Sequence, residues 1–120
     1  MKISDFDTDL LLALMELHGA STTKLAHILF KPIDDYELRK QDSKVRYRLE
    51  RMVKQELLKK NGAKYVVNVE RVFLTDSAMH LGIGVDVPMG LMLVAYPKDG
   101  PLWMRQITLE KRRQISENAL

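Results

Sequence analysis

The stretch SKVRYRLERMVKQELL, residues 43–58, constrains the fold more than any other part of the chain. Val45, Leu49 and Met52 recur at the spacing of one helical face, which predicts an α-helix over about 43–57. Lysine and arginine side chains occupy the other face of this helix. Such a helix must bury its apolar face against a core and leave a cationic face in solvent.

The stretch SDFDTDLLLALMELHGA predicts a first helix, capped at its start by Asp5 or Asp7 and ended by Gly19. Its main apolar stripe would face the core. Leu11 and Met15 form a second apolar stripe. Because a helix that is apolar on two sides needs a second cover, we expect either the C-terminal segment or a second subunit to lie on it.

The stretch STTKLAHILF predicts a second helix, capped by Ser21 or Thr22 and ended before Pro32. The residues that follow, 31–42, are mostly polar and predict a connector with at most one short helical turn. The basic helix would begin after this connector.

The pair Asn61-Gly62 lies between two β-prone runs and is typical of a hairpin with a type I′ turn. RVFLTDSAMHLG then predicts a short strand, a helix cap at Thr75 or Asp76, and a helical turn closed by Gly82. We therefore expect a strand pair directly after the basic helix.

The last third of the chain has a weaker pattern. Two apolar runs around PKDGP are interpreted as a second hairpin, although a helix would also fit either run. TLEKRRQISENAL predicts a terminal helix capped by Thr108. Trp103 lies in the uncertain region and suits either a core position or an interface.

Positive charge is concentrated in the middle of the chain. Residues 39–71 hold eleven Lys and Arg against four Asp and Glu, whereas the whole chain has a net charge of only +3. The remaining residues are therefore net negative. This asymmetry points to an anionic polymer as partner. The alternative is that these charges only solvate a helix face.

Three helices followed by a hairpin resemble the winged helix-turn-helix family of DNA-binding regulators. The matching stretches are STTKLAHIL as the positioning helix, SKVRYRLERMVKQELL as the recognition helix and its exit, and KKNGAKYVVNVERVFLT as the wing. The chain is particularly similar to small archaeal and archaeal-virus repressors of this kind. The resemblance implies an α+β, mainly helical fold with a winged-helix domain over 5–82. Residues 83–120 lie beyond the resemblance and are expected to be a C-terminal extension that packs on the domain, forms a dimer interface, or does both.

Two features depart from the family pattern. The connector over 31–42 is longer than the usual turn between the second and third helices. Glu56 stands where the family usually has a glycine at the end of the recognition helix. The first departure affects the angle between the two helices, and the second affects how the recognition helix ends.

The resemblance implies double-stranded DNA as partner and sequence-specific regulation of transcription. A homodimer is expected from the second apolar stripe of the first helix and from residues 83–120, which the minimal fold does not require. An α-helix fits the major groove, whose base edges carry a readable pattern of donors and acceptors. The expected DNA contacts from the basic helix are Ser43, Lys44, Arg46, Tyr47, Arg48, Arg51 and Lys54. Arg48 lies nearest the core boundary and would reach a phosphate. Glu50 would either accept from cytosine N4 or pair with Lys54.

The hairpin and the second helix add further expected contacts. Lys59, Lys60, Asn61 and Lys64 would contact the DNA backbone or the minor groove. The alternative is that edge-strand lysines only prevent aggregation. Thr22 and Thr23 lie at a helix N-terminus, where they would bind a phosphate or act as caps alone.

The pattern does not favour an enzyme, a cofactor or a metal site. The three histidines are widely separated, there is no cysteine, and GIGV lacks the lysine and Ser/Thr of a phosphate loop. No apolar run reaches the roughly 18 residues that span a bilayer. The acidic start MKISDFDTD differs from a secretory signal and favours a cytoplasmic protein.

Two other functions fit the same pattern. The chain could be a winged-helix protein-interaction module of a larger assembly. It could also be a plasmid or viral replication-control protein that binds DNA without regulating transcription.

Overall fold

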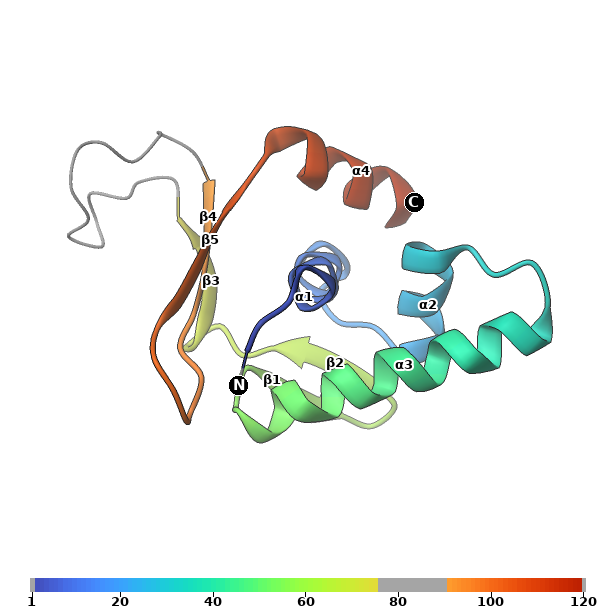
Figure 1. Cartoon of the computed structure of the whole chain (residues 1–120), viewed down its shortest axis with the longest axis horizontal. Helices are drawn as coiled ribbons and strands as arrows, with labels where there is room; N and C mark the ends of the chain where they lie inside the picture. Colours follow the sequence, from blue (N-terminus) through green and yellow to red (C-terminus); the bar gives the residue numbers. More distant parts are fainter. Residues whose placement is uncertain (1, 76–90, 120) are drawn as a thin grey trace.

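The computed structural model describes residues 2–75 and 91–119, which form an α+β fold of four helices and five strands (Figure 1). In chain order the elements are α1 (Asp5–Leu17), α2 (Thr22–Phe30), α3 (Asp35–Lys54), β1 (Leu58–Asn61), β2 (Lys64–Val67), β3 (Val72–Thr75), β4 (Leu91–Ala95), β5 (Trp103–Ile107) and α4 (Leu109–Ala119). Strands β1 and β2 form an antiparallel hairpin, and β3, β4 and β5 form a separate antiparallel sheet in that order. This architecture is compatible with the expected helical core plus hairpin.

Helix α1 begins with a reciprocal cap, but the capping residue differs from the predicted one. Ser4, not Asp5 or Asp7, is the N-cap: its hydroxyl accepts from the Asp7 amide at 3.2 Å, and its own amide donates to the Asp7 carboxylate at 2.9 Å. Serine followed three residues later by an acid satisfies two helix-end amides at once. At the other end His18 (φ 55) makes the left-handed turn, and Gly19 (φ 112) follows it.

Helix α2 has the expected ends, but α3 does not. Ser21 caps α2 by accepting from the Lys24 amide at 3.2 Å, and the helix ends before Pro32. Residues 35–42, predicted as a connector, are instead the first half of α3. Asp34 caps this helix by accepting from the Glu37 amide at 2.8 Å. An aspartate cap with acidic residues in the first turn is a helix start, which the polar composition of the segment concealed.

The end of α3 also differs from the prediction, because the helix stops at Lys54 rather than near Leu57. Glu56 adopts a left-handed conformation, φ 62, and the Leu57 amide donates back to the Met52 carbonyl at 3.0 Å. This is the hydrogen-bond pattern that ends many helices at a glycine. The position where the resembled family usually has glycine therefore has the conformation that glycine favours.

The β1–β2 hairpin is confirmed, with its turn one residue later than expected. Asn61 pairs with Lys64, so Gly62 and Ala63 form the turn. Of these residues only Gly62 has a positive φ, 64°. A glycine at the first turn position fits a type II′ rather than a type I′ turn. Burial of Tyr65 and Val67 on one face of the strand sets this register.

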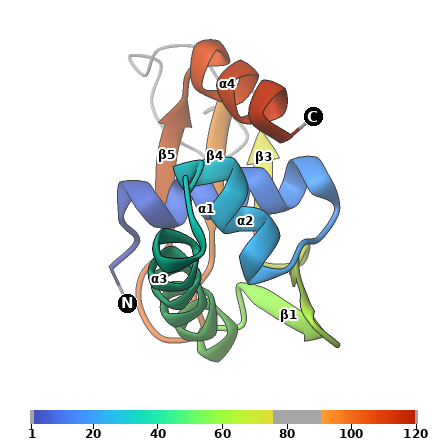
Figure 2. The same cartoon turned by 90° about the vertical axis from the view of Figure 1, so that its right-hand side faces the viewer.

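The core lies where α1, α2, α3 and the hairpin meet. Val45, Leu49 and Met52 are fully buried, as predicted, and so is Leu11 of α1. Helix α4 lies along α1 on the side away from α3 (Figures 1 and 2). The C-terminal segment is therefore the cover that the apolar sides of α1 required.

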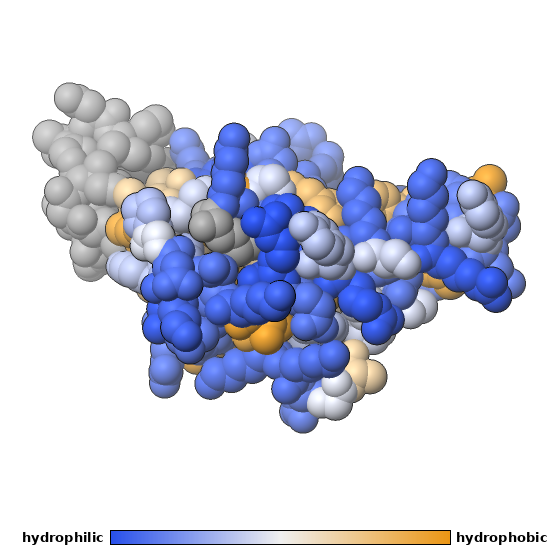
Figure 3. Space-filling model, turned by 60° about the horizontal axis from the view of Figure 1, so that its bottom comes forward, coloured by the Kyte–Doolittle hydropathy of each residue, from blue (hydrophilic) through white to orange (hydrophobic). Residues whose placement is uncertain are grey.

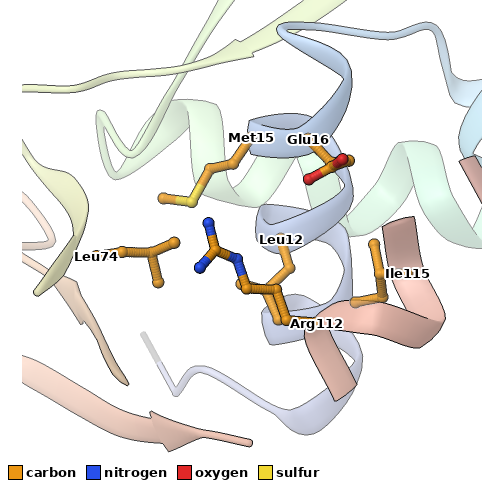
Figure 4. Close-up of a pocket in the computed structure, with 6 residues that line it drawn as sticks. All are labelled: Leu12, Met15, Glu16, Leu74, Arg112 and Ile115. Carbon is orange, nitrogen blue, oxygen red and sulfur yellow. The ribbon is translucent and has the colours of Figure 1, made fainter. Parts of the chain in front are cut away.

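Polar contacts and a small cavity mark the α1–α4 interface. The Ser116 hydroxyl donates to the Glu16 carboxylate at 2.7 Å. Figure 4 shows Arg112 reaching from α4 past Leu12 toward Met15 and Leu74, at a cavity of about 70 Å³.

The second hairpin and the terminal helix are also confirmed. Strands β4 and β5 flank PKDGP, and Ala95 pairs with Trp103, which packs on the core. The Thr108 hydroxyl accepts from the Lys111 amide at 3.1 Å, as expected of a cap. The helical turn predicted after Thr75 falls within 76–90, outside the described residues. Within the described ranges, no helix has the length and apolarity needed to cross a membrane.

Candidate nucleic-acid interface

Helix α3 and the β1–β2 hairpin lie side by side along one side of the molecule, the lower one in Figure 1 (Figures 1 and 2). Seen from this side, the surface is largely hydrophilic, with small hydrophobic areas scattered over it (Figure 3). The side chains of α3 that point away from the core are here called the α3 outer face. They are Lys40, Ser43, Tyr47, Arg51 and Lys54.

The α3 outer face is open to solvent except at Arg51, which is partly buried. Tyr47 is 62% exposed, and Ser43 and Lys54 are exposed. The Arg51 guanidinium lies over the Tyr47 ring, 5.9 Å from its centroid. In the part of the chain that the structure describes, no carboxylate pairs with Arg51.

Arg46 lies on the shoulder of α3 that faces the start of α2. It pairs with Asp42 at 3.2 Å and donates to the Thr22 hydroxyl at 3.3 Å, while the Thr23 hydroxyl donates to Asp42 at 3.1 Å. Partial burial raises the pKa of Asp42, but hydrogen bonds from Thr22, Arg46 and Thr23 outweigh it, so the pKa is lowered. Thr22 is buried. Both threonines therefore tie α2 to α3 in addition to their expected place at the helix start.

An open groove of about 250 Å³ lies beside these residues, between the start of α2 and the tip of the hairpin. Arg46 and Lys60 line it from two sides. Two cations and a helix start in one groove are suited to a phosphate group.

Arg48 faces inward, and its expected phosphate contact is replaced by a buried ion pair. Its Nε donates to Asp7 at 2.8 Å, and a second guanidinium nitrogen contacts the other oxygen. Asp7 is fully buried and the Arg48 side chain is 19% exposed. The hydrogen bonds to Asp7 raise the pKa of Arg48 above its ordinary value. The sequence predicts Asp7 only at a helix start, because a pair between residues so far apart in the chain leaves no local pattern.

Lys44 points to the side of α3 opposite the hairpin. Its ammonium lies over the rings of Phe6 and Phe30, at 5.1 Å and 5.4 Å from their centroids. This cation–π contact holds an exposed ammonium against the protein surface. Lys44 therefore lies apart from the α3 outer face.

Glu50 is engaged by the hairpin rather than by Lys54. It accepts a hydrogen bond from the Tyr65 hydroxyl and pairs with Lys60 at 3.3 Å. The Tyr65 bond, and then the Lys60 bond, hold the pKa of Glu50 below its ordinary value. Burial and the Glu50 contact raise the pKa of Tyr65. The negative charge of Glu50 is thus paired with groups of the hairpin.

Tyr65 also joins the hairpin to the turn between α1 and α2. Its amide donates to the Ala20 carbonyl at 2.8 Å, and the Ala20 amide donates back at 3.1 Å. A side chain at Gly19 would meet Val66 of β2, at 3.2 Å from its nearest methyl. The alternating pattern of Tyr65 and Val67 indicates one buried strand face, and this was the available signal for the role of Tyr65.

The hairpin residues divide between two faces. Lys60 and Tyr65 form a cross-strand pair on the side toward α3. Because strand side chains alternate, Lys59, Asn61 and Lys64 point to the other side of the ribbon. All of them are exposed. The structure therefore brings only Lys60 of this set directly beside α3.

Two further observations concern other kinds of site. The described ranges contain no group of three or more His, Asp and Glu side chains that could hold a metal ion. A groove of about 300 Å³ between the end of α1 and strands β2 and β3 is lined mostly by apolar side chains. Among known proteins, no family model, curated protein or solved structure matches this chain.

Proposed function

We propose that this chain is a winged-helix protein that binds double-stranded DNA sequence-specifically and regulates transcription. Residues 5–82 would be the DNA-binding domain and 83–120 its extension. Helix α3 would enter the major groove through its outer face, and the β1–β2 hairpin would act as the wing on the backbone or the minor groove. The observation that carries the proposal is the exposed α3 outer face, held beside a lysine-bearing hairpin by Glu50.

The physical argument rests on shape and charge together. Helix α3 has 20 residues, which is about 30 Å of helix. An α-helix fits the major groove, where Arg and Lys read guanine and neutralise phosphates. Arg48 is paired with buried Asp7, and Lys44 lies over the rings of Phe6 and Phe30, away from the hairpin. The DNA contacts would therefore come mainly from Arg46, Arg51 and Lys54, together with the hairpin lysines.

The test is direct binding to duplex DNA at several salt concentrations. A pool of random duplexes would be passed over the protein, and the retained duplexes sequenced. The affinity of the protein for the selected duplex would then be measured by fluorescence anisotropy. About five phosphate contacts predict a log–log slope of affinity against salt of about −4.5. A variant carrying Lys59→Gln and Lys64→Gln should bind the same sequence more weakly, and its log–log slope of affinity against salt should be shallower by about 1 to 2.

Absence of duplex binding at every salt concentration would contradict the proposal and favour the protein-interaction module. Ile33 (88% exposed) and Tyr36 (76% exposed), near the start of α3, would then be the first surface to examine. A target inside a replication origin rather than a promoter would instead indicate replication control.

The homodimer is part of the proposal, because two-fold proteins read paired half-sites about one helical turn apart. The second apolar stripe of α1 no longer supports it, since the chain itself covers that helix. Light scattering at micromolar concentration, with and without the selected duplex, tests it. A single protomer under both conditions would contradict the dimer and leave DNA binding intact.

A further inference from the structure

The arginines at 43–54 of α3 have different surroundings, and this difference identifies the one that is free to read a base. Arg46 is paired with Asp42 and Thr22, and Arg48 is paired with buried Asp7. Within the described residues, Arg51 has no acidic partner. Its guanidinium therefore keeps its full set of hydrogen-bond donors for a ligand.

The Arg51 guanidinium lies over the Tyr47 ring on the α3 outer face. The two residues are one helical turn apart, and the guanidinium carbon is 5.9 Å from the ring centroid. Contact with an aromatic face restricts the guanidinium while its edge N–H groups remain available. Restricting a long side chain before binding lowers the entropy lost when the complex forms.

Glu50, the acidic side chain that could read cytosine, is already hydrogen-bonded within the protein. Glu50 would be the acceptor for cytosine N4, but Tyr65 and Lys60 already occupy its carboxylate. The other outer-face side chains, such as Ser43 and Lys54, lack the planar donor fork that matches guanine O6 and N7. The only such fork left on this part of α3 is that of Arg51.

We propose that Arg51, positioned by Tyr47, is the specificity-determining residue of the α3 outer face and reads one guanine through its O6 and N7 atoms. This inference rests on the proposed function, since it requires that α3 enter the major groove. It predicts that the target site contains one guanine per protomer whose Hoogsteen edge is indispensable.

The test uses a duplex retrieved from the random pool, with each guanine replaced in turn by 7-deazaguanine. This base pairs normally but lacks the N7 acceptor. The unaltered protein should lose affinity about 5- to 100-fold at one guanine per protomer. Arg51→Ala should bind more weakly and lose this position-specific penalty. Arg51→Lys should keep the salt slope and also lose the penalty.

Variants of Tyr47 separate positioning from other roles. Tyr47→Phe keeps the ring face and should keep the penalty at that guanine, whereas Tyr47→Ala should reduce it. Arg39→Ala, at an exposed arginine about one helical turn before Ser43, is the matched control and should leave base preference unchanged. Thermal unfolding of each variant would verify folding.

The outcomes are distinguishable. Duplex binding by the unaltered protein, with the same 7-deazaguanine penalty in Arg51→Ala, would overturn this inference and leave the proposed function standing. No duplex binding by the unaltered protein at low salt would overturn the proposed function and this inference with it.

Discussion

Glu50 of α3 accepts a hydrogen bond from the Tyr65 hydroxyl of β2 and thereby links the basic helix to the hairpin that follows it. Lys60 of β1 adds an ion pair at 3.3 Å. Tyr65 is in turn bonded through its backbone to Ala20, between α1 and α2. One tyrosine therefore connects the three parts of the chain that surround the candidate interface.

Removing the Tyr65 hydroxyl should weaken this connection. We expect Tyr65→Phe to lower the free energy of unfolding by about 1–2 kcal/mol, because the lost bond is to a charged acceptor while the ring remains buried. Urea denaturation measures the change. Tyr47→Phe, at an exposed ring, is the control and should change stability by less than about 0.5 kcal/mol. Equal stability of Tyr65→Phe and the unaltered protein would contradict the role assigned to the hydroxyl.

The Glu50 cluster should also give stability a pH dependence. The pKa of Glu50 is lower in the folded protein than its ordinary value, because Tyr65 and Lys60 bond the ionised form. Its contribution is therefore fully present above the ordinary glutamate pKa and is lost as the pH falls through the folded pKa. In Glu50→Gln the stability difference from the unaltered protein should shrink as the pH is lowered from 7 into the acid range. A difference that stays constant over that range would show that Glu50 does not titrate with folding.

The Arg48–Asp7 pair should be structural rather than DNA-binding. Arg48→Ala leaves a fully buried carboxylate without its partner, so we expect a loss of about 3 kcal/mol in the free energy of unfolding. Arg51→Ala is the matched control on the outer face and should cost less than about 0.5 kcal/mol. If Arg48→Ala were as stable as Arg51→Ala, the buried pair would not hold α1 to α3. Chemical denaturation of the two variants measures this difference.

The left-handed residue at the end of α3 allows a stabilising substitution. Glu56 has φ 62, a conformation that costs a non-glycine residue about 1 kcal/mol. Its ion pairs with Arg71 at 3.0 Å and Lys98 at 4.0 Å involve exposed side chains and contribute little. Glu56→Gly should therefore raise the free energy of unfolding by about 0.5 kcal/mol.

Glu56→Ala is the control for this substitution. It loses the same ion pairs but keeps the backbone strain, so it should be slightly less stable than the unaltered protein. A less stable Glu56→Gly variant in thermal unfolding would show that the ion pairs outweigh the strain.

Local patterns predicted much of the architecture. The buried face of Val45, Leu49 and Met52 follows from helical spacing, and the β1–β2 hairpin follows from a glycine between two β-prone runs, although its turn is Gly62–Ala63 and not Asn61-Gly62. The start of α3 was missed because the polar segment 35–42 has a weak apolar pattern. Its helical state depends on the Asp34 cap and on packing of the helix behind it.

The sequence by itself determined the order of three helices and a hairpin, the core face of the basic helix and the concentration of cations around it, because periodicity and charge are properties of neighbouring residues. Tertiary structure alone decided which cations remain available. Asp7 lies 41 residues from Arg48, and Tyr65 lies 15 from Glu50, so only folding brings these groups into contact. Pairing between distant residues is set by how the helices and hairpin pack. It leaves Arg51 without an acidic partner among the described residues, whereas the sequence treats every arginine of the basic helix alike.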